Sequence, residues 1–188
     1  MMAKKRVIIV TDGDRIARKA VETAAQNVGG RCISTSYGNP TLLPAAEIVD
    51  LIHQTPYDPV LVMVDDDGNA HKGKGEKVLE ELLNDESIQV LGVVAVASAT
   101  ENVQGVSVQY SITRDGRIIR GAVDKGGEEQ VDVPGVLIGD TVDALNYSRV
   151  PVVVGIGDPG KMGHHDDWTK GAPVTTKAVE FILKRSSS

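Results

Sequence analysis

Residues 59–67 read PVLVMVDDD, an uninterrupted apolar run that ends in three aspartates. The run is rich in Val, starts at a proline and is too short for a helix, so it predicts a strand buried on both faces of a parallel sheet. Residues 7–10, VIIV, form a second run of this kind, followed by Asp12 and Asp14. Ligands of open α/β sheets bind beyond the carboxyl ends of such strands, so both acidic segments are expected at a site.

The rest of the chain alternates between predicted strands and helices. Asp14 is placed to cap a helix whose apolar stripe ends before Gly29 and Gly30. The remaining segments follow the same two patterns: strands at 31–34, 89–97 and 151–154, and helices at 44–54, 78–83, 140–145 and 175–185. This alternation predicts a doubly wound, three-layer α/β fold, Rossmann-like or Toprim-like, with a mostly parallel sheet and helices on both faces.

Residues 106–123 follow a different pattern. Apolar and polar residues alternate through 106–113, the turn Arg114-Asp115-Gly116 follows, and a second short run begins at Arg117. We expect an antiparallel hairpin that extends the sheet at its edge. No internal repeat or linker interrupts the chain, so residues 1–188 are predicted to form one domain.

Composition narrows the class of protein. The net charge of −6 argues against sequence-independent binding of nucleic acid, which needs clustered Lys and Arg. The single cysteine, Cys32, excludes an internal disulfide and suits a reducing compartment. No apolar signal core stands at the N-terminus, and the longest apolar stretch, 90–97, is too short to cross a bilayer. We therefore expect a protein made in the cytoplasm, without a signal peptide or a membrane span.

The acidic segments predict a site for a hard cation. Carboxylates gathered at one sheet edge repel one another unless a cation, a ligand donor or a proton separates them. We expect Asp12, Asp14, Asp65 and Asp67 to converge there and to bind Mg²⁺ or Ca²⁺ through oxygen ligands.

A glycine-rich segment, GIGDPGK at 155–161, follows the last predicted strand. It matches a dinucleotide fingerprint in spacing, but Pro159 and the polar residues after it leave no helix to face a pyrophosphate, so no nucleotide cofactor is expected. The segment predicts either a structural glycine loop or a ligand-binding loop. The ligand-binding hypothesis rests on Gly155, Gly157, Asp158, Gly160 and Lys161.

Blocks spread over nearly the whole chain resemble one family, the soluble form of stage V sporulation protein AE. The resemblance lies in the combination of these blocks rather than in any one of them. They are RVIIVTDGD at 6–14, GGRCIS at 29–34, GNPT at 38–41, VLGVVAVAS at 90–98, VDK at 123–125 and VVVGIGDPGKM at 152–162.

This resemblance implies a role in sporulation. The family belongs to a set of products associated with movement of dipicolinic acid and its calcium salt into the developing spore and out on germination. Most of that set are membrane proteins, so the resemblance implies a soluble accessory peripheral to the spore inner membrane. The implied partners are other stage V sporulation proteins, membrane and soluble; a small-molecule ligand and a homo-oligomer stay open, and nucleic acid is not expected.

A weaker resemblance is to Toprim domains, the metal-binding units of topoisomerases and primases. Asp65 and Asp67 stand where those domains carry Asp-x-Asp after a strand, whereas Asp12 or Asp14 would replace their catalytic Glu. The alternative function is therefore Mg²⁺-dependent phosphoryl transfer, or another Toprim-like reaction, at the aspartate cluster.

Overall fold

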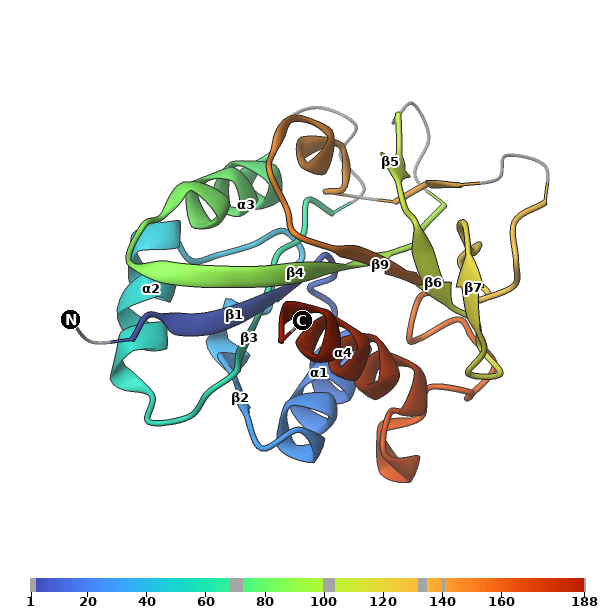
Figure 1. The fold of residues 1–188 in the computed structure, drawn as a ribbon, viewed down its shortest axis with the longest axis horizontal. Coiled ribbons are helices and arrows are strands. Elements are labelled where there is room, and N and C mark those ends of the chain that lie inside the picture. The colour runs from blue at the N-terminus through green and yellow to red at the C-terminus, as the bar shows by residue number, and fades with distance from the viewer. Residues whose placement is uncertain (1–2, 68–72, 100–103, 132–134, 140, 188) are drawn as a thin grey trace.

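The computed structural model describes residues 3–67, 73–99, 104–131, 135–139 and 141–187. Its main element is a seven-stranded sheet with the strand order β2-β3-β1-β4-β9-β6-β7 (Figure 1). The strands are β1 (Lys5–Val10), β2 (Arg31–Cys32), β3 (Val60–Met63), β4 (Ile88–Val96), β6 (Tyr110–Ile112), β7 (Ile118–Arg120) and β9 (Val153–Ile156). All neighbours are parallel except β6 and β7, which form an antiparallel pair at the edge.

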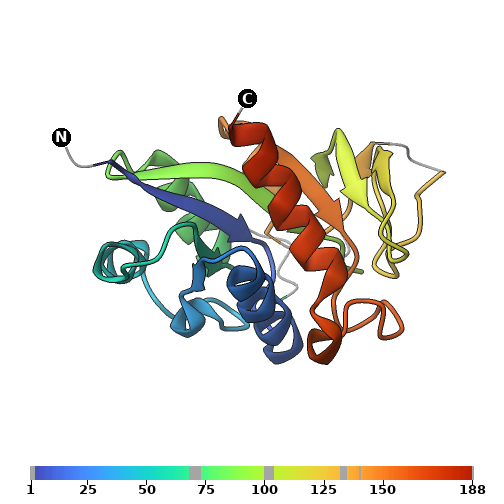
Figure 2. The ribbon, with the colours of Figure 1, turned by 60° about the horizontal axis from the view of Figure 1, so that its bottom comes forward.

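Helices cover both faces of this sheet. Side chains of a strand point alternately to its two faces, and in β1 Val7 and Ile9 join the core under α2 (Ala45–Gln54) and α3 (Lys74–Asn84). Ile8 and Val10 join the core under α1 (Arg15–Asn27) and α4 (Pro173–Ser186), two helices that lie together on the other face (Figure 2). In the part of the chain that the structure describes, no helix is both long and apolar enough to cross a membrane.

This architecture confirms the predicted α/β class, the mostly parallel sheet and the antiparallel extension. Two short strands were not predicted as a pair: β5 (Val106–Ser107) pairs with β8 (Val136–Leu137) in a separate antiparallel sheet. The predicted strand 106–113 breaks between β5 and β6 because the Val108 N–H bonds to the carbonyl of Gly135 instead of continuing the hairpin.

Three short 3-10 helices also depart from the expected elements: η1 (Ser34–Ser36), η2 (Asp143–Tyr147) and η3 (Trp168–Lys170). η1 replaces the end of the predicted strand 31–34. The Ser36 hydroxyl donates to the carbonyl of Ile33 and accepts from the Met63 N–H at 2.9 Å. The Met63 N–H of β3 thus donates to a side chain instead of to a backbone carbonyl of a neighbouring strand. The backbone therefore turns after β2. Of the helix predicted at 140–145, residues 143–145 form the start of η2, Thr141 and Val142 precede it as non-helical residues, and Asp140 lies outside the described residues.

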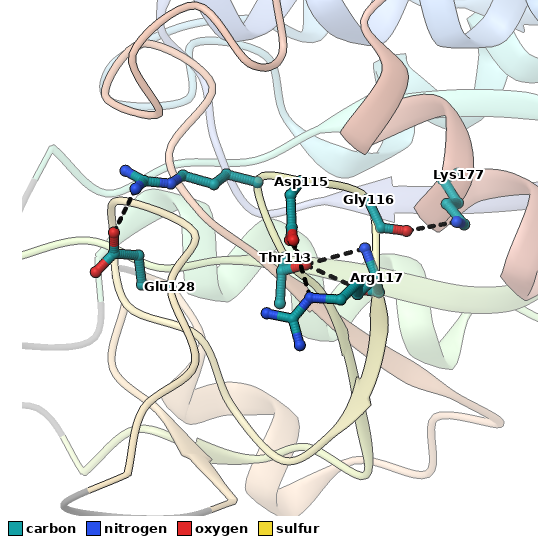
Figure 3. Close-up of polar contacts among 7 residues, drawn as sticks. Thr113, Asp115, Gly116, Arg117, Glu128 and Lys177 are labelled. Carbon is teal, nitrogen blue, oxygen red and sulfur yellow. Dashed lines mark hydrogen bonds and ion pairs between the residues drawn. The ribbon is translucent and has the colours of Figure 1, made fainter.

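Polar contacts fasten the β6–β7 hairpin to α4 (Figure 3). Across the turn, the Thr113 N–H donates to the carbonyl of Arg117, and the Arg117 N–H donates back to the Thr113 hydroxyl at 3.0 Å. The Lys177 ammonium of α4 donates to the carbonyl of Gly116 at the turn. The hairpin is therefore held by the last helix as well as by its own ladder.

Candidate functional site

Three aspartates meet beyond the carboxyl ends of β1 and β9. Asp12 follows β1, Asp14 begins the segment that leads into α1, and Asp158 follows β9. One carboxylate oxygen from each lies within 4.8 Å of those of the other two. We call these three side chains the aspartate triad. Because β4 separates β1 from β9 in the sheet, the two loops meet over the end of β4.

Backbone N–H groups orient each member of the triad. The Asp14 N–H donates to Oδ1 of Asp12 at 3.1 Å, and Oδ1 of Asp14 accepts from the Ala17 N–H at 2.8 Å, as the N-cap of α1. Oδ1 of Asp158 accepts from the Gly160 N–H at 2.8 Å. These bonds fix the carboxylates, and because each carboxylate has two oxygens, acceptor capacity remains for a further ligand.

The triad concentrates negative charge in a poorly solvated place. Asp12 and Asp158 are each 8% exposed. Burial raises the pKa of Asp12 well above its usual value, repulsion from Asp14 raises it further, and Asp158 and Asp65 add smaller contributions, against the Asp14 N–H bond that lowers it. Among the described residues, Lys161 is the only cation within ion-pair distance of the triad, with Nζ 3.3 Å from Oδ2 of Asp158. A bound cation would relieve the remaining repulsion.

The three consecutive aspartates after β3, Asp65 to Asp67, have different positions and partners in the structure. Asp65 lies beside the triad and accepts the Gly13 N–H at 3.0 Å through Oδ2 and the Asp67 N–H at 3.1 Å through Oδ1. Asp66 accepts the N–H groups of Gly75 and Glu76, so it caps α3. Asp67 is exposed, has a positive φ of 56° and is not a member of the triad.

The carboxylates that lie together in the structure thus differ from the set of cation ligands predicted from the sequence. Asp12 and Asp14 lie together as expected, Asp65 lies next to them through Gly13, and Asp158 occupies the third position. Sequence reasoning assigned Asp158 to the glycine loop. The available signal was its position two residues after the end of a buried strand, which matches that of Asp12.

The glycine-rich segment packs against protein atoms at its start. A Cβ on Gly155 would overlap the Ser111 hydroxyl and lie 2.7 Å from a methyl of Leu137, and one on Gly157 would lie 2.5 Å from the Gly127 nitrogen. These two glycines permit close packing of β9 and its loop. Gly160 is more open, since its Cβ would meet nothing closer than 3.3 Å. Asp158 is a member of the triad and Lys161 is its ion-pair partner, so the ligand-binding hypothesis for this segment rests on its second half.

These features define the class of protein: a doubly wound α/β domain with a carboxylate-rich site at the carboxyl edge of its parallel sheet. A family model described as stage V sporulation protein AE1 matches residues 6–186. The chain therefore belongs to this sporulation family, as its sequence blocks indicate. No curated protein and no solved structure shows a significant match to the chain.

Proposed function

We propose that the protein is an accessory of spore formation that binds a divalent cation through the aspartate triad and acts in the uptake and release of dipicolinic acid as its calcium salt. Family membership supports the sporulation role. The link to dipicolinic acid and germination comes from the family resemblance of the sequence blocks. In this proposal the partners are other stage V sporulation proteins, and the place of action is the surface of the spore inner membrane.

The observation that carries the cation proposal is the convergence of Asp12, Asp14 and Asp158 within 4.8 Å, with two of the three residues 8% exposed. Carboxylate oxygens are the preferred ligands of Ca²⁺ and Mg²⁺. Lys161 forms an ion pair with Asp158 and would move aside when a cation enters. Its side chain is 55% exposed, so the displaced ammonium would reach water.

Titration calorimetry with Ca²⁺ and Mg²⁺ tests the binding step. The wild-type protein should bind one of the two ions, and Asp12→Asn or Asp158→Asn should weaken binding by about tenfold or more, because each change removes an anionic ligand. Asp50→Asn is the matched control, since Asp50 is an exposed carboxylate on α2. Equal affinities in all four proteins would contradict the assignment of the site.

Spores of a strain that lacks the gene test the proposed role in uptake and release of dipicolinic acid. Cells that lack the gene should make spores with altered dipicolinic acid content or germination timing, and the wild-type gene should restore both. A gene carrying Asp12→Asn together with Asp158→Asn should restore neither if cation binding is part of the role. Normal dipicolinic acid content and germination without the gene would refute the proposed process.

The alternative is Mg²⁺-dependent phosphoryl transfer or a Toprim-like reaction at the same triad, because a carboxylate-held Mg²⁺ is also what such enzymes use. The net charge of −6 weighs against a polyanionic substrate. Purified protein should therefore hydrolyse no nucleotide and cut no nucleic acid. Metal-dependent cleavage that Asp12→Ala abolishes would reverse this ranking.

A further inference from the structure

A cavity of about 250 Å³ opens between the segment 41–44 and α3, apart from the aspartate triad. Leu42, Leu43, Pro44 and Val78 supply an apolar lining. Leu42 is 69% exposed, although a leucine side chain is more stable when it leaves water. An occupant that covers Leu42 would therefore be favoured.

The segment that forms one wall is anchored to the sheet. The Thr41 hydroxyl accepts the Asp65 N–H at 2.8 Å and donates to the Asp65 carbonyl at 3.1 Å, and the Thr41 N–H donates to the same carbonyl at 2.9 Å. The carbonyl of Pro44 accepts the Ile48 N–H at the start of α2. Both ends of this wall are thus fixed, so binding would require little ordering of the backbone.

The opposite wall carries two lysines of α3, Lys74 and Lys77. Lys74 is the first residue of the helix, where the helix dipole favours anions rather than cations. Within the described residues Lys74 has no ion pair, and Lys77 has only an exposed contact of 4.0 Å with Glu81, which is worth little. Two weakly paired cations beside an apolar cavity, in a protein of net charge −6, point to an anionic ligand.

We propose that this cavity binds a small organic anion: a carboxylate on an apolar ring or chain, with its body against Leu42, Pro44 and Val78 and its charge at Lys74 and Lys77. The volume fits a body of about one ring, since drug-sized ligands occupy larger pockets of about 300–1,000 Å³. The glutamate at the rim, Glu81, disfavours a second negative charge on its side. The proposal does not depend on the cation site.

Benzoate is a suitable probe, and methyl NMR of the full chain in the presence of EDTA is a suitable readout. Benzoate should shift the methyl signals of Leu42, Leu43 and Val78. Benzamide, a neutral molecule of the same shape, should bind about tenfold more weakly, because it lacks charge-assisted bonds to the lysines. No shift of these methyl signals with benzoate, or equal affinity for the two probes, would overturn the proposal.

Variants test the contributions of the two walls of the cavity separately. Lys74→Gln with Lys77→Gln should weaken benzoate binding by about tenfold or more and leave benzamide binding unchanged. Leu42→Ser should weaken both probes, because it removes the exposed apolar surface that they cover. Lys170→Gln, in η3 and outside the cavity lining, is the control. Benzoate affinity that survives the double lysine change would contradict the assignment. Because EDTA removes divalent ions, failure here would leave the cation proposal intact.

Discussion

The carboxylate of Asp65 accepts a hydrogen bond of 3.0 Å from the backbone N–H of Gly13, which joins the segments that follow β3 and β1. Gly13 also accepts the Gly38 N–H at its carbonyl. Three loops at the carboxyl edge thus meet at one glycine. Asp65 therefore holds the shape of the site, whereas the triad supplies the ligands of the proposed cation.

We predict that Gly13→Ala destabilises the protein. The added Cβ would overlap the carbonyl oxygen of Gly38 and lie 2.7 Å from Cβ of Asp65. Forcing a methyl group into such a packed junction costs about 1–3 kcal/mol. Chemical denaturation should report this loss, and Gly160→Ala should change stability much less. A wild-type midpoint for Gly13→Ala would contradict the described junction.

The Lys177 contact in Figure 3 predicts a local effect on the hairpin. Lys177→Met keeps the apolar stem of the side chain but removes the donor to the Gly116 carbonyl. We expect the free energy of unfolding to fall by about 1–2 kcal/mol, because water replaces a charged donor as the hydrogen-bond partner of the Gly116 carbonyl. Hydrogen exchange should accelerate in the turn 113–117, while the exposed-lysine control Lys170→Met leaves it unchanged. Unaltered exchange in the turn would show that the contact does not hold the hairpin.

Asp166 predicts a pH-dependent stability. It is 2% exposed and accepts the N–H groups of Val174 and Thr175 and the Thr175 hydroxyl, so it holds the start of α4. Asp166→Ala should cost about 2 kcal/mol, because these donors lose a buried partner. Asp166→Asn should cost less, because its amide oxygen still accepts.

Burial raises the pKa of Asp166 above its usual value despite those bonds. Because the folded-state pKa lies above the unfolded-state pKa, ionisation of Asp166 lowers the free energy of unfolding at high pH. This cost shrinks as pH falls from the folded-state pKa towards the unfolded-state pKa and is absent below the latter. Wild type should therefore gain stability relative to Asp166→Asn as pH falls from about 7 to about 4, near the unfolded Asp pKa. Thermal unfolding at a series of pH values measures this difference, and a difference that does not change with pH would refute it.

Cys32 should be inert in the folded protein. The residue is 5% exposed, and burial together with the charge of Glu22 raises the pKa of its thiol to about 12. The thiolate is the reactive form, so alkylation by iodoacetamide at pH about 8 should be slow until the protein unfolds. Mass spectrometry of native and urea-treated samples measures the ratio. Fast native labelling would contradict the buried position.

The sequence predicts the sheet better than it predicts the site. Short Val and Ile runs bounded by turn formers identify β1, β3 and β4, because a strand covered on both faces buries every residue of such a run. Strand order is a long-range property, so the sequence does not indicate that the loop after β9 reaches Asp12. The position of the Asp66 carboxylate depends on the N–H groups at the start of α3, which donate to it once the helix forms. The sequence predicts Asp65 and Asp67 as cation ligands but not Asp66, and the three adjacent aspartates take three different positions.

The central claim is that Asp12, Asp14 and Asp158 hold a divalent cation, and a crystal soaked with Ca²⁺ tests it most directly. The account predicts electron density for an ion with oxygens of these three residues at about 2.3–2.6 Å and with Lys161 withdrawn from Asp158. Clear density for the three side chains with only water between them at millimolar Ca²⁺, and Lys161 still paired, would contradict the claim.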